Sequence, residues 1–187
     1  PPGGPNGDVA GTAIRLVRER CPGGEIGLIV DGTGALADPA GLDREALSRI
    51  VLRAAAEAFA PARLSPGGSL LYRNQRRTAG LRELYRKVEM TGSGLRESWV
   101  TVDEFHQAFD DAIFRVPADL FIPAGGRPET IDGGNWRRYL DADGRPSAAV
   151  LVEGANSFLT PEARRGLQEA GAVVLRDASA NKCGVIS

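Results

Sequence analysis

Hydrophobic residues recur at two kinds of spacing, and segments of the two kinds alternate along most of the chain. Segments with apolar residues three and four positions apart, or with a recognisable helix cap, are predicted to be helices. Thr101 and Glu104 form a capping box, and Thr160 precedes a proline at the first helical position, so both threonines mark helix starts. The four predicted helices cover residues 8–21, 43–59 and 101–115 and a segment that begins at 160.

Short, continuous apolar runs lie between these segments, and a polar or Gly-rich stretch follows each run. Such runs are typical of strands that are buried on both faces of a parallel sheet. The succession of strand, loop and helix predicts an α/β fold: a doubly wound, mostly parallel Rossmann-type sheet with helices on both faces. Right-handed crossovers then place the loops after the strands at one edge of the sheet. The apolar runs are 26–30, 118–123, 148–152 and 172–175.

Residues 61–100 follow this pattern poorly. They contain a Pro/Gly turn at 65–68, a strongly basic run at 73–77 and a Gly/Ser segment at 91–94. We expect an insertion here that carries a strand or two and is partly mobile. The whole chain, residues 1–187, is predicted to form one domain with this insertion, because its length is close to that of a single domain.

The balance of charges narrows the function classes. The 23 Lys and Arg residues nearly cancel the 24 Asp and Glu residues, which leaves a net charge of −1. A general binder of nucleic acid or of membrane surfaces needs a basic excess, so we expect neither partner. No apolar stretch is long enough to cross a bilayer, and no charged-then-apolar leader opens the sequence. The two cysteines, Cys21 and Cys183, fit no metal-binding spacing and predict thiols in a reducing cytoplasm.

A Gly-rich segment at 3–11 opens the first predicted helix. The free amides and the partial positive charge at a helix N-terminus favour a phosphate group there. The dinucleotide fingerprint Gly-x-Gly-x-x-(Gly/Ala) is matched from Pro5 through Gly7 to Ala10, except that Pro5 replaces the first glycine. The segment therefore fits either a pyrophosphate-binding turn or a Gly-rich turn without a ligand.

Asp31 is the candidate for recognition of the ribose. It follows the apolar run 26–30 and lies 24 residues after Gly7. Dinucleotide-binding folds place an acid about 20 residues after the fingerprint, where its carboxylate accepts hydrogen bonds from the adenosine ribose. A carboxylate there also repels a 2′-phosphate, so the spacing predicts NAD rather than NADP. In the other interpretation, Asp31 is a turn residue of the Asp-Gly-Thr-Gly segment.

The remaining candidate side chains are assigned structural roles. His106, the only histidine, lies on the predicted helix 101–115, where a surface or cap position is expected. Trp99 and Trp136 are expected to pack, and Cys183 has no activating group near it in the sequence. No residue of the chain is therefore assigned as catalytic.

Six segments of the chain have sequences more specific than those of ordinary loops. They are Gly-Pro-Asn-Gly-Asp at 4–8, Leu-Ile-Val-Asp-Gly-Thr-Gly at 28–34, Ala-Asp-Leu-Phe-Ile-Pro-Ala-Gly-Gly-Arg-Pro at 118–128, Val-Glu-Gly-Ala-Asn at 152–156, Leu-Thr-Pro-Glu-Ala at 159–163 and Asp-Ala-Ser-Ala-Asn-Lys-Cys-Gly-Val at 177–185. Taken in order, they resemble the large NAD-specific glutamate dehydrogenases of the fungal type, whereas residues 61–100 lack the resemblance. The resemblance implies oxidative deamination of L-glutamate to 2-oxoglutarate and ammonia, with hydride transfer to NAD.

The resemblance also implies a two-domain subunit, of which this chain is the NAD-binding domain. It assigns the pyrophosphate turn to Gly7, Asp8, Val9 and Ala10, and the ribose-binding acid to Asp31. The substrates L-glutamate and 2-oxoglutarate are expected to bind through a domain outside this sequence, so the chain alone should turn over no glutamate. A homo-oligomer is expected for the full-length enzyme.

Four further residues are assigned to the cofactor by the resemblance. Ala124 and Gly125 match the loop beneath the adenosine-side ribose, and Asn156 and Asn181 match two asparagines near the nicotinamide. An asparagine amide both donates to and accepts from a carboxamide, so such residues fix which ring face meets the substrate.

Three departures accompany the resemblance. Cys183 stands where the family pattern has glycine, Pro5 replaces the first fingerprint glycine, and the first strand of the nucleotide domain is expected outside the sequence. Two alternatives stay open. The chain could be the nucleotide domain of another amino-acid dehydrogenase, such as one for leucine or phenylalanine, or a non-catalytic NAD-sensing module.

Overall fold

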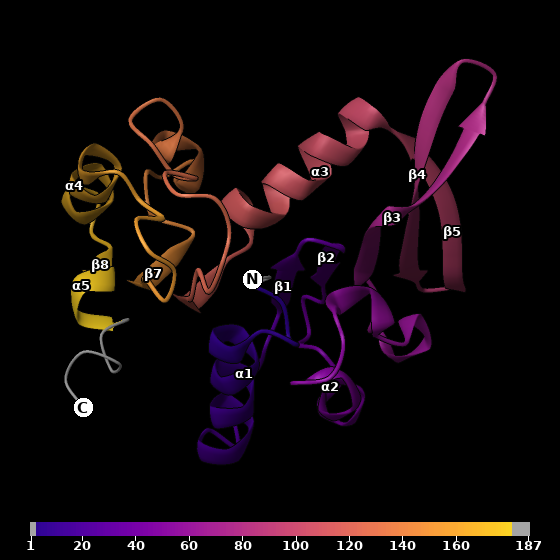
Figure 1. Cartoon of the computed structure of the whole chain (residues 1–187), viewed down its shortest axis with the longest axis horizontal. Helices are drawn as coiled ribbons and strands as arrows, with labels where there is room; N and C mark the ends of the chain where they lie inside the picture. Colours follow the sequence, from indigo (N-terminus) through magenta and orange to yellow (C-terminus); the bar gives the residue numbers. More distant parts are fainter. Residues whose placement is uncertain (1–2, 181–187) are drawn as a thin grey trace. The chain divides into compact units, whose positions relative to one another are not determined.

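The computed structural model describes residues 3–180, which form two compact units that divide between Ile113 and Phe114 (Figure 1). Within the described residues, the N-terminal unit contains an antiparallel sheet of five strands and the C-terminal unit a parallel sheet of three. Helix α3 (Val102–Arg115) lies across the division. The fold is therefore mixed α/β, but the parallel sheet that the sequence predicted is found only in the C-terminal unit.

The strands of the N-terminal unit follow chain order across the sheet, and every neighbouring pair is antiparallel. β1 and β2 form a tight hairpin in which Asp31 pairs with Gly34. A parallel pairing would need a crossover of a dozen or more residues, whereas two residues separate these strands. The run 26–30 thus contributes to a strand as predicted, but its placement in a parallel sheet is wrong. The strands are β1 (Leu28–Asp31), β2 (Gly34–Ala37), β3 (Ser69–Ala79), β4 (Arg82–Thr91) and β5 (Gly94–Thr101).

The region 61–100 contains more regular structure than the sequence indicated. β3, β4 and β5 occupy most of it, and the ladder between β3 and β4 shifts register only between Leu71 and Arg76. Charged side chains pair across the strands, as where Nη2 of Arg86 lies 2.8 Å from Oε2 of Glu97. Charged residues occupy many of the exposed positions of these strands, and the apolar residues between them do not form one continuous run. The expected mobility of this region stays a prediction.

Both faces of the antiparallel sheet are covered by helices. On one face, Ile14 of α1 and Leu47 of α2 join a cluster with Leu70 of the sheet. On the other face, Phe105 of α3 packs against Leu71, the next residue of the same strand. This alternation along β3 is what a strand between two layers of helices requires. The helices of the first face are α1 (Asp8–Arg20) and α2 (Arg44–Ile50).

Helix α2 is shorter than the sequence predicted. Asp43 caps its start by accepting a hydrogen bond from the backbone N–H of Ala46 at 2.7 Å. The predicted helix 43–59 nevertheless ends at Ile50, because Leu52 adopts a left-handed backbone with φ 59° and its N–H donates to the carbonyl of Pro5 at 2.7 Å. The chain continues in two short 3-10 turns, η1 (Ala56–Ala58) and η2 (Pro61–Arg63).

The C-terminal unit has the parallel strand order β6-β7-β8 that the three later apolar runs predicted. Thr160 caps α4 by accepting from the N–H of Ala163, and Trp136 lies against Gly166 of the same helix. Leu151 of the middle strand is completely buried. The elements are β6 (Ala118–Phe121), η3 (Trp136–Tyr139), β7 (Ala148–Val152), α4 (Pro161–Glu169), β8 (Val173–Leu175) and α5 (Asp177–Ala180).

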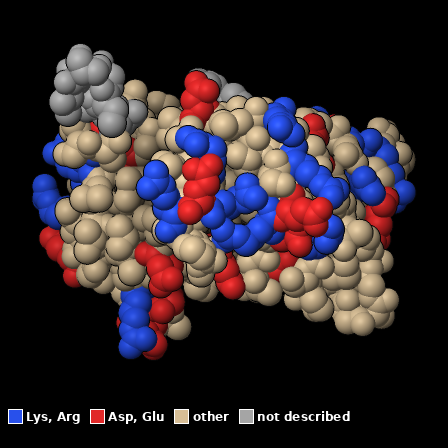
Figure 2. Space-filling view, turned by 90° about the horizontal axis from the view of Figure 1, so that it is seen from below, with Lys and Arg blue, Asp and Glu red and all other residues tan. Residues whose placement is uncertain are grey.

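Basic and acidic side chains are interspersed on the surface that Figure 2 shows. This mixture agrees with the near-zero net charge. Among residues 3–180, no helix combines the length and the apolar character needed to span a membrane. The same residues contain no group of three or more His, Cys, Asp or Glu side chains that could hold a metal ion.

Candidate functional site

The first half of the predicted cofactor site lies at the N-terminus of α1. Gly7 is the N-cap residue, and no side chain caps the helix there. Because the first turn of a helix has no intrahelical acceptors for its amides, residues 8–10 leave backbone donors for a ligand. Asp8 and Val9 are exposed, whereas Gly7 is buried and its N–H donates to the carbonyl of Gly4 at 2.8 Å. The buried side of the turn, at Gly7, is thus held by the protein, whereas the exposed side, at Asp8 and Val9, is accessible to a ligand.

Two glycines allow the turn to approach its neighbours closely. A Cβ atom on Gly4 would overlap the carboxylate of Asp31, and a Cβ on Gly11 would lie 2.5 Å from the carbonyl oxygen of Pro5. The sequence pattern had emphasised Gly7 and Ala10 instead. The structure shows that glycine is required at 4 and 11 for packing, so these two residues position the candidate phosphate turn.

Asp31 lies beside this turn at the end of β1, and the residue is only 6% exposed. One oxygen, Oδ1, accepts hydrogen bonds from the N–H and the hydroxyl of Thr33 at 2.7 and 2.6 Å. The other, Oδ2, accepts from the N–H of Ala56 at 2.8 Å. Asp31 therefore joins the hairpin turn, the η1 segment and the phosphate turn. Its role in ribose binding stays a prediction.

Thr33 and Ala56 were missed by the sequence reasoning. The Asp-Gly-Thr-Gly segment signals Thr33, because an Asp side chain commonly accepts from the backbone two residues later. Nothing in the sequence signals Ala56, which lies 25 residues beyond Asp31 and meets it only in the fold.

The second half of the predicted site lies at the carboxyl ends of β6 and β7. The N–H of Ala155 donates to the carbonyl of Pro123 at 2.7 Å, which joins the loop bearing Ala124 and Gly125 to the loop bearing Asn156. Asn156 is exposed at this edge. Ligands of parallel α/β sheets bind at such an edge. The structure thus brings together three of the predicted residues, while Asn181 lies outside the described residues.

The loop after β7 is also joined to the segment after β8. Ser157 has a left-handed backbone with φ 52°, and its N–H donates to Oδ2 of Asp177 at 2.9 Å. This bond and a second one from the N–H of Ala178 hold the pKa of the Asp177 carboxyl below its ordinary value. The carbonyl of Ser157 accepts from the N–H of Glu129 at 2.7 Å. The backbone next to Asn156 is therefore fixed from two sides.

The other candidate side chains have surroundings that fit structural roles. His106 is exposed on α3 with its ring edge against Phe105, as expected for a surface residue. Trp99 is half-buried beneath the guanidinium of Arg77, 4.5 Å from its ring. Lys87, within the predicted insertion 61–100, lies in β4 and pairs with Glu89 at 2.7 Å.

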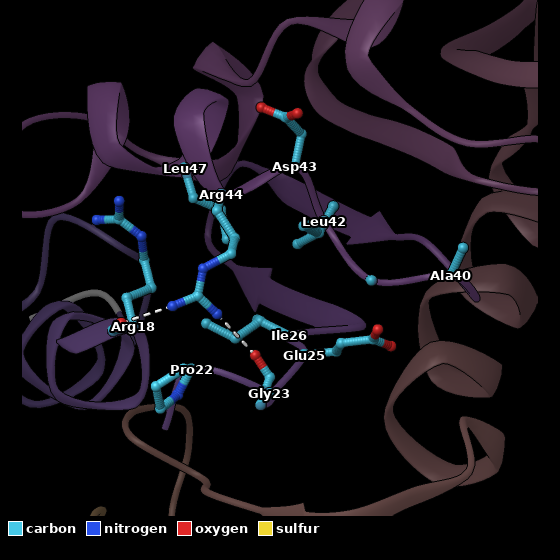
Figure 3. Close-up of a pocket in the computed structure, with 12 residues that line it drawn as sticks. Arg18, Pro22, Gly23, Glu25, Ile26, Ala40, Leu42, Asp43, Arg44 and Leu47 are labelled. Carbon is cyan, nitrogen blue, oxygen red and sulfur yellow. Dashed lines mark hydrogen bonds between the residues drawn. The ribbon is translucent and has the colours of Figure 1, made fainter. Parts of the chain in front are cut away.

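A cavity of about 250 Å³ lies at the opposite end of α1 (Figure 3). Arg44 fills part of it, donating to the carbonyls of Arg18 and Gly24 at 2.5 and 2.9 Å. A cation in this position satisfies carbonyls at and beyond a helix C-terminus. Since α1 has 13 residues, the cavity is about 20 Å from the phosphate turn. We assign it a bracing role rather than a part in the candidate site.

Comparison with known proteins shows similarity over the whole chain. A "Probable NAD-specific glutamate dehydrogenase" of Schizosaccharomyces pombe is 38% identical over 186 residues, and an "NAD-specific glutamate dehydrogenase" of Neurospora crassa is 37% identical over 186 residues. The alignments cover 99% of this chain but 15% and 16% of those proteins. The chain thus spans about a sixth of the length of these relatives. The matches extend through residues 61–100, where the sequence motifs showed no resemblance.

Among solved structures, a glutamate dehydrogenase of Plasmodium falciparum has a similar fold. It matches with a TM-score of 0.57 over 96% of this chain and 30% of that chain, at 14% sequence identity. In addition, residues 3–187 match the model of the family described as Glutamate/Leucine/Phenylalanine/Valine dehydrogenase. The chain therefore belongs to the glutamate/leucine/phenylalanine/valine dehydrogenase family.

Proposed function

We propose that the chain is the NAD-binding part of an NAD-specific glutamate dehydrogenase. The observation that carries the proposal is identity of 32–38% over 99% of the chain to four proteins whose names include glutamate dehydrogenase, three of them NAD-specific. The reaction is oxidative deamination of L-glutamate to 2-oxoglutarate and ammonia. When bound, NAD accepts the hydride that leaves the α-carbon of glutamate.

The turn at the start of α1 is suited to the pyrophosphate of the cofactor. Gly7 places the chain at the helix N-terminus, and the amides of Asp8, Val9 and Ala10 supply donors without a competing side-chain cap. The fit is supported by the exposure of Asp8 and Val9 and by the close packing that fixes the turn from behind. The Asp8 carboxylate then points away from the phosphates, because two anions repel at contact distance.

Asp31 is proposed to distinguish NAD from NADP. Its Oδ2 atom accepts one protein hydrogen bond and retains a lone pair for a ribose hydroxyl. A 2′-phosphate at the same place would bring a second negative charge against a carboxylate held in position by Thr33. This arrangement favours the unphosphorylated ribose.

The loops after β6, β7 and β8 are proposed to hold the remainder of NAD. Ala124 and Gly125 offer a surface with at most a methyl side chain beneath a ribose. Asn156, together with Asn181, supplies amide groups that donate to and accept from the nicotinamide carboxamide. Binding and orienting the ring is the contribution of these residues, since none of them abstracts a proton.

Substrate binding and proton transfer are proposed to reside in other parts of the polypeptide. The relatives are about six times longer than the matched region, which leaves ample chain for a substrate domain. Deamination needs a general base with a pKa near neutrality, and arginine, the dominant cation here, titrates far too high for that role. L-glutamate and 2-oxoglutarate would therefore meet the cofactor only in the whole protein, for which we propose a homo-oligomer.

The test is NADH formation by the whole polypeptide that the gene encodes. L-glutamate should give turnover with NAD, and this chain alone should give none. Leucine or phenylalanine as the preferred substrate would instead support another amino-acid dehydrogenase. NAD binding without turnover of any amino acid would support a non-catalytic sensor.

Cofactor selection needs a separate measurement. Asp31→Ser should weaken NAD binding in calorimetric titrations, because the charge-assisted hydrogen bond to the ribose hydroxyl is lost. The same substitution should improve NADP binding, because the carboxylate no longer repels the 2′-phosphate. An unchanged ratio of the two affinities would contradict the assignment of Asp31.

A further inference from the structure

A buried ion pair lies directly beneath the loop that follows β7. Glu153 is completely buried and Arg164 of α4 is 8% exposed. Nε and Nη2 of Arg164 lie 3.2 and 2.9 Å from Oε2 of Glu153, so two N–H groups of the guanidinium donate to one carboxylate oxygen. The other oxygen, Oε1, accepts from the N–H of Leu159 at 3.0 Å, and Nη2 also donates to the carbonyl of Leu159 at 3.2 Å.

These contacts hold both ends of the loop with a single pair of side chains. Glu153 follows the last residue of β7, and Leu159 precedes the residue that caps α4. Both polar groups of the Leu159 backbone are bound by the pair, one by each partner. The loop between Glu153 and Leu159 therefore has fixed ends, and Asn156 lies at its middle.

Stability alone does not account for a buried ion pair here. Removing two charges from water costs several kcal/mol per ion, and apolar residues of similar volume often replace such pairs with no loss of stability or a gain. An apolar pair, however, would leave the N–H and the carbonyl of Leu159 without these partners. What the ion pair provides, and an apolar pair would not, is a fixed position for the backbone of Leu159.

We propose that Glu153 and Arg164 are positioning residues that hold Asn156 in place for the nicotinamide carboxamide. The proposal rests on the proposed NAD-binding function and extends it to two residues that touch no part of the cofactor. Their role is to fix the loop, and Asn156 makes the contact. Asp177 supports the same loop through the N–H of Ser157 from the opposite side.

The test compares NADH with ADP-ribose, which lacks the nicotinamide. Both ligands are titrated calorimetrically into the whole polypeptide that the gene encodes, and the ratio of their dissociation constants is the readout. Arg164→Met should weaken NADH binding roughly five- to tenfold, the size of one lost hydrogen-bonded contact, with ADP-ribose affected by less than about twofold. Arg165→Met, which removes an exposed arginine next to it on α4, should change neither affinity.

A double-mutant cycle with Asn156→Ala separates positioning from folding. Asn156 is exposed, so its truncation should keep the fold while lowering NADH affinity relative to ADP-ribose. If the ion pair acts through Asn156, adding Arg164→Met to Asn156→Ala should change the ratio no further. Full additivity of the two changes in this ratio would overturn the proposal. So would an Arg164→Met protein whose affinities for NADH and ADP-ribose fall by the same factor.

The variant in which both Glu153 and Arg164 become leucine provides a second test. It should remain folded, because no unpaired charge is left buried, and it should still bind NADH as weakly as Arg164→Met, because the backbone of Leu159 has lost both partners. Wild-type NADH affinity in this variant would overturn the positioning role while leaving NAD binding intact. A wild-type protein that bound neither NADH nor ADP-ribose would instead overturn the proposed function and, with it, this proposal.

Discussion

Replacement of Asp31 by alanine should destabilise the N-terminal unit whether or not a nucleotide is present. The carboxylate accepts three hydrogen bonds, of which the one from the N–H of Ala56 is the most costly to lose, because Ala56 is completely buried. An unsatisfied buried donor costs about 1–3 kcal/mol, while water can replace part of the two bonds from the half-exposed Thr33. The expected loss in the free energy of unfolding is about 2–4 kcal/mol.

Urea unfolding followed by tryptophan fluorescence measures this loss. The chain has two tryptophans, one in each unit, so a Trp136→Phe background leaves Trp99 as the reporter of the N-terminal unit. Asp143→Ala serves as a control, because Asp143 is exposed and its ion pair with Arg145 is long at 3.8 Å, so a change below about 0.5 kcal/mol is expected. An Asp31→Ala protein as stable as the control would refute the structural role of the carboxylate.

Three further predictions concern the C-terminal unit. Gly166→Ala should cost about 1–3 kcal/mol, since the added Cβ would lie 2.6 Å from the ring of Trp136; a thermal midpoint equal to wild type would contradict the packing. Thr160→Ala removes the hydroxyl that caps α4 and should cost about 1 kcal/mol, measured by urea unfolding. The backbone bond from Ser157 lowers the pKa of Asp177, so this contact is fully present above the ordinary value of about 3.9 and is lost as the pH falls through the lower folded value. The protection factor of the Ser157 amide should therefore fall only in that acidic range; a protection factor that did not change there would count against the contact.

Local signals in the sequence located the elements that local interactions determine. The capping box predicted the start of α3, and the structure has both of its bonds, with the N–H of Glu104 donating to the Thr101 hydroxyl at 3.3 Å and the N–H of Thr101 to the Glu104 carboxylate at 2.7 Å. The three later apolar runs predicted β6, β7 and β8, and these runs do form parallel strands. The expected burial on both faces is wrong for β6 and β8, most of whose residues are exposed. These features need no knowledge of distant residues.

Features that depend on distant partners were missed. The run 26–30 is as apolar as the runs that form the parallel strands. Its antiparallel pairing arises from the short turn that connects β1 to β2. The candidate site shows the same limit: Asp31 was identified by spacing, but its bond to Ala56 joins residues 25 positions apart. Glu153 and Arg164 were likewise not singled out, because their charges gave no sign of the buried pair that they form.

Amide hydrogen exchange with and without NADH tests whether the cofactor binds at the start of α1 and at the loop after β7. NADH should slow exchange at the first-turn amides of α1, residues 8–10, and in the loop 153–159, while the cavity-lining residues 22–26 should exchange as before. Protection at both predicted places would support the proposed contacts of the cofactor in each of the two units. Protection confined to residues 22–26, or none at either predicted place at saturating NADH, would contradict it.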